Sequence, residues 1–390
     1  MMIYIGSFVL VIGVLVFVHE LGHYLAARSV GVRIEKFSIG FPPRFISLTS
    51  IKDGWDITIF FYRFSNGRLS WGPVLNTNFH IIGRKGSGTE YVVALLPLGG
   101  YVKMAGALDE SLDTVVTNSP DEFMSKSVLQ KIWILSAGVL MNIFTAFVIF
   151  SLLTYSQGIP EYNNEPIIGQ LSPDGPAIKA GLESEDEILS VNGQEILTWI
   201  DLVENIRPIP DSPVDIEIQR DQEILKFSFN TTKIVIPVEN GIDSVGGIGI
   251  TQKYYYQAVN FGESIYYGYQ KTIRSFGLIT LTFQMLGSGQ ATLKDLGGPI
   301  MIGQIAGETA KAGWQPLFNF MALISINLAF LNILPIPGLD GGHIFLLLIE
   351  SIIRRPLSLK SRMVVQQIGM VFLLVLMVTI MFNDVTRLFN

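Results

Sequence analysis

Four stretches of the chain are apolar over enough residues to cross a lipid bilayer, and this restricts the fold more than any other feature. A hydrocarbon core of about 30 Å takes about 20 residues of apolar helix. Of the 390 residues, 49% are hydrophobic and only 15% are charged, which is too apolar for a soluble protein of this length. The four stretches are residues 3–27, 132–155, 317–334 and 364–382. We therefore predict a polytopic α-helical membrane protein with transmembrane helices within residues 1–30, 132–155, 317–343 and 363–383.

A fifth apolar segment, residues 273–286, is shorter than a span and follows a tyrosine-rich amphipathic run at 254–269. This pattern is typical of a helix that lies in the membrane interface. We predict that residues 254–312 form an interfacial, amphipathic helix and a Gly-Gly-Pro-Ile segment. If residues 273–286 crossed the bilayer, the orientation that follows would fail.

The short loop between the third and fourth stretches sets the predicted orientation. Between the predicted spans 317–343 and 363–383, the basic residues are Arg354, Arg355, Lys360 and Arg362, against one acidic residue, Glu350. The positive-inside rule makes this loop cytoplasmic. Four spans then place both termini and residues 166–250 outside the cytoplasm, and residues 31–131 on the cytoplasmic side.

The first apolar stretch runs into His19-Glu20-Leu21-Gly22-His23. Residues i and i+4 of a helix share one face, so both imidazoles can bind one metal ion, with Glu20 beside them. Zinc suits this pattern because its catalytic sites use three protein ligands and one water. The chain has no cysteine, so any further ligand is His, Asp or Glu. A chance match is the alternative. Two of only four histidines occur here, and ionisable groups at membrane depth are rare without a function.

Composition and charge argue against two other interpretations. A signal peptide at the N-terminus fits poorly, because there is no basic segment before the apolar run and no small-residue cleavage site after it. The net charge of −6 and the absence of basic runs give no indication of nucleic-acid binding.

A second polar segment lies at the end of the third stretch, where residues 332–343 read Asn-Ile-Leu-Pro-Ile-Pro-Gly-Leu-Asp-Gly-Gly-His. The predicted orientation places it on the same side of the membrane as His19 and His23. Asp340 can therefore complete a His, His, Asp set for one zinc ion. Two prolines remove helical hydrogen bonds, so we expect the helix to break there. The alternatives are an ordinary Asp-Gly turn at a helix end and His343 as a competing ligand.

The segment 31–131 is rich in β-forming residues, notably at 55–61 and 91–95, with glycine and proline between the runs. Such runs predict β-hairpins. Because they are apolar and follow a span directly, we expect a membrane-associated β region on the cytoplasmic side, whose edges must be covered.

Residues 166–250 form a separate predicted module. A strand, a small-residue turn, a short helix, a second strand and the turn Asn192-Gly193 follow in that order. The pattern resembles a PDZ domain (α+β) of the bacterial, circularly permuted type, which could bind a peptide along a sheet edge. The alternative is a plain β-rich extracytoplasmic domain.

The whole chain resembles the bacterial site-2 proteases of the RseP type, which are intramembrane zinc metalloproteases. The specific parts of the resemblance are residues 19–23 and 332–342, supported by 31–41, 97–104 and 296–300. The resemblance implies that Glu20 is the catalytic base and that one Zn²⁺ is bound by His19, His23 and Asp340.

The resemblance also implies roles for residues near the second motif. Asn332 would help to hold the substrate backbone, and Pro335 and Asn327 match further positions of the family pattern. Three departures put substrate selection in doubt. Pro42 stands where the family often has glycine, Val139 stands where it usually has proline, and only one PDZ module is found instead of two.

The implied function is hydrolysis of peptide bonds within transmembrane segments, in the cytoplasmic (inner) membrane of a bacterium. Expected substrates are single-span membrane proteins, such as an anti-sigma factor trimmed beforehand, or signal-peptide remnants. Two alternatives from other classes are a PDZ-containing membrane receptor or chaperone without proteolysis, and a metal transporter. A transporter would need a polar path across the bilayer, for which the apolar stretches offer few ionisable residues.

Overall fold

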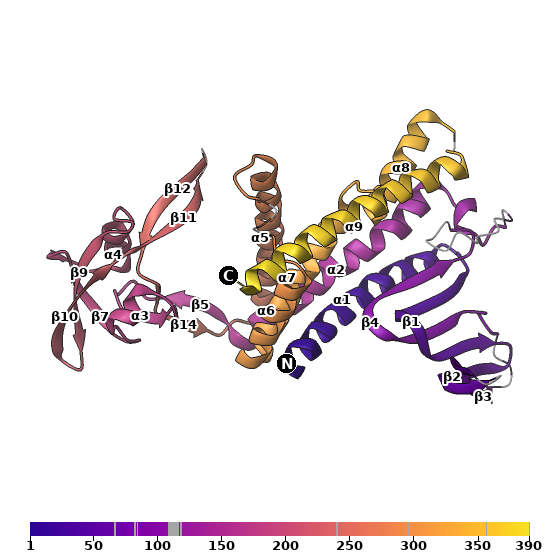
Figure 1. Ribbon diagram of the computed structural model, residues 1–390, viewed down its shortest axis with the longest axis horizontal. Helices are drawn as coiled ribbons and strands as arrows, with labels where there is room; N and C mark the ends of the chain where they lie inside the picture. Colours follow the sequence, from indigo (N-terminus) through magenta and orange to yellow (C-terminus); the bar gives the residue numbers. More distant parts are fainter. Residues whose placement is uncertain are drawn as a thin grey trace. The chain divides into compact units, whose positions relative to one another are not determined.

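The computed structural model describes residues 1–65, 68–81, 83, 85–107, 117, 119–238, 241–292, 294, 296–355 and 357–389. The chain forms two compact units (Figure 1). The helical unit consists of Met1–Leu153, Ile265–Leu286 and Ala291–Asn390, and the β-rich unit of Thr154–Ser264 and Gly287–Gln290. Each unit has its own apolar core.

The four predicted spans are confirmed as helices. Among the described residues, four helices are long and apolar enough to cross a membrane. They are α1 (Met2–Ser29), α2 (Val128–Gln157), α7 (Trp314–Ile333) and α9 (Leu359–Phe389) (Figure 1). The core that α1, α2 and α7 share is formed by Val11, Leu15, Ala146, Phe150, Ala322 and Ile326. These helices are apolar on most faces, as expected where lipid replaces water.

The third span ends earlier than predicted, and a further helix follows it. α7 ends at Ile333, and α8 begins at Asp340 and runs to Ile353. The predicted break between them is confirmed. The helix breaks there because prolines cannot donate the hydrogen bonds that continue a helix. Gly338 turns the chain with a φ of +97°, which favours glycine. α8 was not predicted as a separate helix, since its apolar residues continue the pattern of the span.

The predicted helix at residues 254–312 is wrong in its first part. Tyr254–Gln257 form strand β14, which pairs with β5 (Ile159–Tyr162) in the β-rich unit. Tyrosine is favoured in strands, so the same tyrosine-rich run fits both an amphipathic helix and a β-strand. Helices occur later, as α5 (Phe261–Gly287) and α6 (Pro299–Ala312).

α5 packs against α7, and its predicted position in the membrane interface stays a prediction. The rings of Phe276 and Phe283 lie 5.5 and 4.9 Å from the ring of Phe330 in α7. Thr272 and Ser275 on the same helix are buried. An amphipathic pattern indicates that one face is covered but does not tell whether lipid headgroups or another helix cover it.

A four-stranded antiparallel sheet follows α1 and confirms the predicted hairpins. Its order is β3-β2-β1-β4. The strands are β1 (Ile34–Ile51), β2 (Gly54–Ser65), β3 (Arg68–His80) and β4 (Glu90–Met104), and the short 3-10 helix η1 (Phe123–Ser125) precedes α2.

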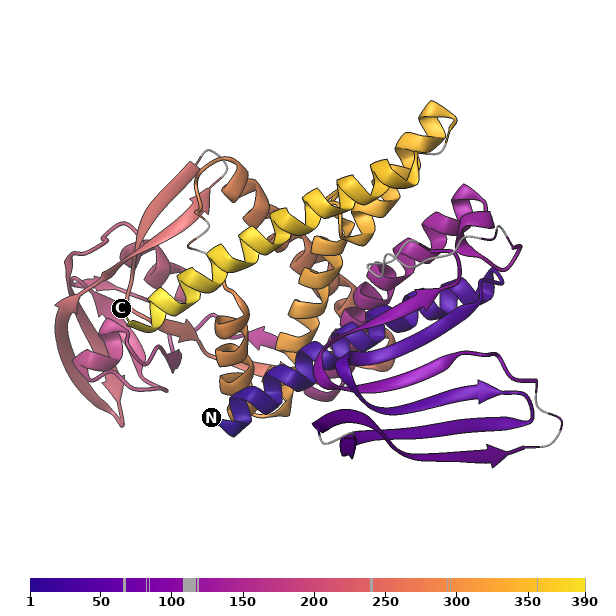
Figure 2. The ribbon, with the colours of Figure 1, turned by 45° about the vertical axis from the view of Figure 1, so that its right-hand side comes forward.

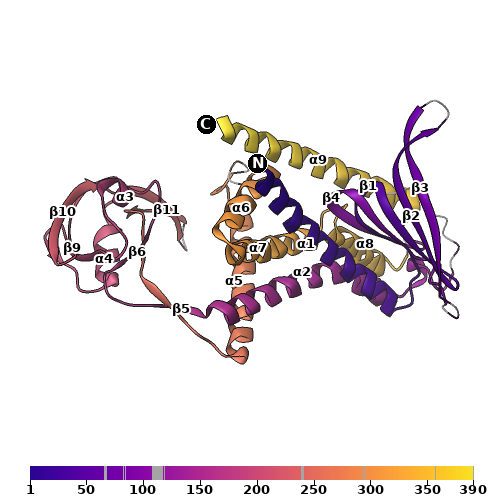
Figure 3. The same ribbon diagram turned by 90° about the horizontal axis from the view of Figure 1, so that it is seen from below.

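β1 and β4 bend and pair with each other twice. Lys36 in β1 lies opposite both Glu90 and Lys103 of β4. The C-terminal part of β4 therefore flanks the start of β1, next to α1 (Figures 2 and 3). Phe17 of α1 packs edge-on against Phe37 of β1, with ring centroids 5.9 Å apart. This contact fixes the sheet against the helix that carries His19 and His23.

The β-rich unit has the predicted order of elements. β6 (Ile168–Leu171), α3 (Pro176–Ala180) and β7 (Glu187–Val191) precede the turn at Asn192 and Gly193, whose φ angles are +51° and +78°. The later elements are β8 (Gln194–Glu195), α4 (Trp199–Ile206), β9 (Pro213–Arg220), β10 (Glu223–Asn230), β11 (Thr232–Val238), β12 (Gly241–Gly247) and β13 (Ile250–Gln252). Its central sheet has the order β10-β9-β7-β8.

Candidate metal centre

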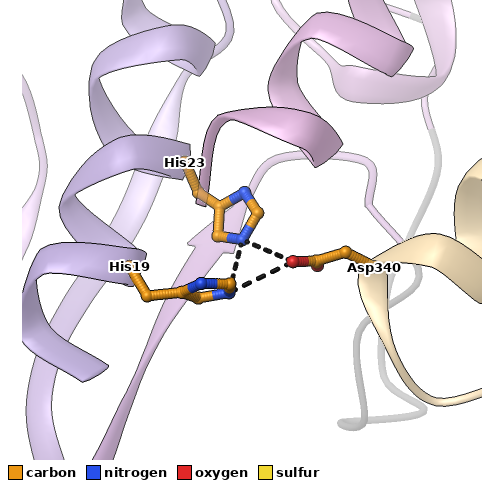
Figure 4. Close-up of side chains that lie close together, drawn as sticks. All are labelled: His19, His23 and Asp340. Atoms are coloured by element: carbon orange, nitrogen blue, oxygen red, sulfur yellow. Dashed lines mark hydrogen bonds and ion pairs between the residues drawn. The ribbon is translucent and has the colours of Figure 1, made fainter. Parts of the chain in front are cut away.

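Three side chains from two distant segments converge on one point in the helical unit (Figure 4). The Nε2 atoms of His19 and His23 are 3.1 Å apart on adjacent turns of α1. Oδ2 of Asp340, the first residue of α8, lies 3.1 Å from the first and 3.3 Å from the second. The three side chains are 12, 8 and 16% exposed, respectively.

The chemistry of these three atoms suits a cation between them. Nδ1 of His23 lies 2.8 Å from the carbonyl oxygen of Ile134, which can only accept, so Nδ1 carries the proton. Nε2 of a neutral His23 then presents a lone pair. Oδ2 of Asp340 is buried without a hydrogen bond. Lone pairs that face one another at this distance are stabilised when a positive ion binds them.

The spacing of the three atoms fits zinc. Zinc bonds of about 2.0–2.2 Å in tetrahedral geometry place ligand atoms about 3.3–3.6 Å apart. The separations of 3.1, 3.1 and 3.3 Å lie at or just below the lower end of this range. Two imidazoles and one carboxylate also form a typical catalytic zinc set, with the fourth position left for water.

Two glycines permit the close approach of α1 and α2 at this site. A Cβ atom at Gly22 would overlap the carbonyl oxygen of Ala137. A Cβ atom at Gly138 would lie 2.5 Å from Nε2 of His23 and 2.6 Å from Cε1 of His19. A side chain at either position would therefore move the helices apart or displace the imidazoles.

The chain between α7 and α8 folds back on itself and directs Asp340 to the histidines. A Cβ atom at Gly341 would overlap the carbonyl oxygen of Ile333, and one at Gly342 would overlap that of Ile336. The two glycines after Asp340 are thus required for the close packing of the start of α8 against the preceding loop.

The site opens into a cavity of about 800 Å³ that is lined by Glu20, Asn332 and His343. Residues 100–104 of β4 also line it. The backbone of this strand lies against Glu20, because a Cβ atom at Gly100 would be 3.4 Å from its Cγ atom. Glu20 therefore lies in the same cavity as the three converging side chains, beside the strand.

The structure brings together most of the predicted site residues. His19, His23 and Asp340 form the cluster, and Glu20 and Asn332 line the cavity beside it. Asn327 and Pro335, both within the described part of the chain, do not line it. Pro42, one of the departures from the family pattern, does.

Asn142 was not predicted as a site residue. It lies on α2, is fully buried and has its Nδ2 atom 3.4 Å from Nδ1 of His19. The sequence contained a signal, because an amide side chain in the middle of an apolar span needs a polar partner. Which partner it has depends on how α1 and α2 cross, and a local pattern does not contain that information.

A buried ion pair lies at another part of the cavity wall. Arg362 of α9 donates from Nε and Nη2 to Glu350 of α8, at 2.9 and 2.6 Å. The backbone amide of Leu357 donates to the same carboxylate at 2.9 Å. The ion pair between Glu350 and Arg362 thus joins α8 to α9.

Comparison with known proteins finds relatives over nearly the whole chain. The family described as peptidase family M50 matches residues 7–67 and 74–376. The regulator of sigma-W protease RasP of Bacillus subtilis is 29% identical, with 98% of each chain aligned. The zinc metalloprotease RasP of Bacillus licheniformis is 29% identical over 98% of this chain and 99% of its own. Among solved structures, the PDZ domain of an SdrC-like protein from Listeria monocytogenes is 18% identical, covers 24% of this chain and 93% of that chain, and has a TM-score of 0.20.

Proposed function

This chain belongs to peptidase family M50 and is a membrane zinc metalloprotease, and we propose that it hydrolyses peptide bonds within the transmembrane segments of other membrane proteins. The observation that carries the proposal is the position of Glu20. It shares one cavity with His19, His23 and Asp340, on a helix long and apolar enough to cross a membrane. Hydrolysis at that depth can act on a substrate that is itself embedded in the bilayer.

We propose that His19, His23 and Asp340 hold the zinc ion and that Glu20 is the general base. Zinc in such a site polarises a carbonyl and lowers the pKa of its water to roughly 7. The Glu20 carboxylate takes the proton from the attacking water and later passes it to the leaving amine. The Glu20 side chain lines the cavity and packs beside Gly100 of β4.

The substrate backbone is proposed to bind as an added strand. A helical carbonyl is shielded by its own hydrogen bonds, so the scissile segment has to be extended before attack. Residues 100–104 of β4 line the cavity and pair on one side with β1, where Ser38 lies opposite Tyr101. Among the described residues no strand pairs with their other side. An extended peptide on that edge would be held by main-chain hydrogen bonds, and Asn332 lies in the same cavity to support it.

We propose the bacterial cytoplasmic membrane as the location, with both termini and the β-rich unit outside the cytoplasm and the active site near the cytoplasmic side. The basic residues that follow α8, Arg354, Arg355, Lys360 and Arg362, support this orientation. The substrates in this proposal are single-span membrane proteins, such as an anti-sigma factor trimmed beforehand, or signal-peptide remnants. The Bacillus subtilis relative is named a regulator of sigma-W protease, which supports the anti-sigma class.

Residues 166–250 are proposed to form a PDZ domain that excludes substrates with bulky external domains and can bind a peptide strand. The order strand, short helix, strand and Asn-Gly turn supports the assignment. Deleting residues 166–250 should permit cleavage of an untrimmed substrate. Unchanged selectivity of the deletion variant would count against the exclusion role.

The test of the proposed chemistry is Glu20→Gln. Loss of a general base lowers turnover by roughly 10²- to 10⁴-fold, while zinc content stays at the wild-type level because no ligand is changed. Glu161→Gln, at an exposed position of β5, is the matched control and should cleave a membrane-embedded substrate normally. Normal turnover by the Glu20 variant would refute the assignment. The same inactive variant can trap membrane proteins that bind the site, which would identify the substrate.

A further inference from the structure

α2 carries polar partners for both histidines of the metal centre. The carbonyl oxygen of Ile134 lies 2.8 Å from Nδ1 of His23, and the amide of Asn142 lies 3.4 Å from Nδ1 of His19. The two partners are two helical turns apart, and the two histidines are one turn apart on a helix that crosses α2. Each imidazole therefore has its Nδ1 atom directed to α2 and its Nε2 atom directed to Asp340.

The proton positions decide what Asn142 does. If Nε2 of His19 is to bind a metal, its lone pair must be free and the proton must be on Nδ1. Nδ1 is then a donor, and the partner that suits it is an acceptor. A half-turn of the Asn142 amide exchanges Oδ1 and Nδ2, which have nearly the same shape. Oδ1, which otherwise is buried without a hydrogen bond, then accepts from Nδ1 of His19. Nδ2 is left to the cavity, which Asn142 lines.

We propose that Asn142 is a positioning residue for the metal centre, because its Oδ1 atom accepts the Nδ1 proton of His19 and so fixes the ring with Nε2 toward Asp340. The inference rests on the proposed function of His19 as a zinc ligand. Partners of this kind orient metal-binding histidines, and their loss typically lowers metal affinity by about 10- to 100-fold.

A hydrogen bond from α7 holds the backbone of Asn142 in place, which keeps its side chain beside His19. Asn142 is fully buried on an apolar helix. Its own carbonyl oxygen accepts a hydrogen bond of 2.8 Å from Ser325 of α7, which is also fully buried. α1, α2 and α7 are thus joined at one residue. An amide in this position without a partner would be costly in a membrane interior.

The test compares zinc affinities of purified full-length variants by competition with a chelator. Asn142→Leu keeps the approximate size but removes the acceptor, so the affinity should fall by about 10- to 100-fold. Asn142→Asp keeps an acceptor at the same place and should bind zinc at least as tightly as Asn. Thr145→Val is the matched control. Thr145 lies one turn further on α2, and its hydroxyl donates only to the carbonyl of Met141 on its own helix, so affinity should not change.

A packing role for Asn142 gives the opposite result. An apolar side chain of similar size would then be tolerated, and a buried aspartate would not. Wild-type zinc affinity of Asn142→Leu together with weakened binding by Asn142→Asp would therefore overturn the proposal.

Cobalt(II) in place of zinc supplies a second measurement that does not depend on activity. The visible absorption of cobalt reports the identity and geometry of its ligands. Asn142→Leu should change this spectrum, because His19 is no longer held in one orientation, and Asn142→Asp and Thr145→Val should keep it. An unchanged spectrum in Asn142→Leu overturns the role of Asn142. Failure of the wild-type protein to bind either metal would instead overturn the metal centre itself.

Discussion

Gly138 of α2 lies directly against His23 of α1, so that a Cβ atom at Gly138 would be 2.5 Å from the Nε2 atom of the imidazole. The ring of His19 is equally close, with Cε1 at 2.6 Å. The wall of the candidate metal centre on this side is therefore a bare helix backbone. Any side chain at this position has to occupy space that the two imidazoles already fill.

Gly138→Ala should abolish most of the proteolytic activity. The added methyl group has to displace an imidazole, and a misplacement of about 1 Å at a catalytic centre can lower the rate by about 100-fold. The same variant should bind zinc more weakly. Proteolysis of a membrane-embedded substrate and zinc content of the purified protein measure the two effects.

Gly6→Ala is the control for this prediction. Gly6 also lies in an apolar span, on α1, but a Cβ atom there would meet no atom within 4 Å. It should keep wild-type activity and zinc content. If both alanine variants were equally active, the close packing at Gly138 would have no catalytic importance.

Zinc should raise the thermal stability of the wild-type protein but not that of Asp340→Asn. Binding to the folded state stabilises it by about 2.7 kcal/mol when free zinc is 100 times the dissociation constant. The amide of Asn lacks the charge that balances the ion, so the variant should show little increase at the same zinc concentration. Unfolding temperatures in detergent at increasing zinc concentrations measure this. Equal increases in both proteins would exclude Asp340 as a ligand.

Breaking the ion pair of Glu350 and Arg362 should destabilise the helical unit. The two side chains are only 11 and 15% exposed, so Glu350→Leu leaves a buried guanidinium without its partner. Removing one member of a buried pair typically costs about 3–5 kcal/mol. Unfolding in detergent by a denaturant measures the loss.

The double variant Glu350→Leu with Arg362→Met tests whether the pair itself is responsible. Both charges are then gone, so much of the stability lost in the single variant should return. Equal losses in the single and the double variant would show that packing at Glu350, rather than the unpaired charge, is what matters.

The sequence predicted the parts of this protein that are set by local patterns. Apolar length alone predicted the four spans, and the i, i+4 spacing predicted that His19 and His23 would face one point. Asp340 could be assigned to the same site as the two histidines, because the predicted membrane orientation places both segments on one side of the bilayer. The break before Asp340 followed from proline, which cannot donate a helical hydrogen bond.

The remaining features depend on which elements meet, and residue patterns do not specify this. Asn142 was visible as a polar residue in a span, but its position beside His19 depends on how α1 crosses α2. Gly138 could be read as a glycine in a span, but its contact with the imidazoles of His19 and His23 could not be predicted. Similarly, the tyrosines of β14 fit an amphipathic helix and a strand equally well until their pairing with β5 is known.

The stability of α4 in the β-rich unit should depend on pH through Asp201. Asp201 and Thr198 form a reciprocal cap at the start of this helix. The hydrogen bond with the Thr198 side chain, together with backbone amides, lowers the pKa of Asp201 below its ordinary value of 3.8. A carboxyl group whose pKa is lowered by folding stabilises the folded state above pH 3.8. This contribution is lost as the pH falls through the pKa of the folded state.

Hydrogen-exchange protection of the α4 amides between pH 6 and pH 2 measures this dependence. Asp201→Asn cannot ionise, so its α4 should be less protected than that of the wild type at pH 6, and the two should become equal once the wild-type carboxyl is protonated. Asp174→Asn, at an exposed position before α3, should follow the wild-type curve throughout. If Asp201→Asn kept wild-type protection at pH 6, the charge of Asp201 would not stabilise the helix, and the cap would act only through its hydrogen bonds.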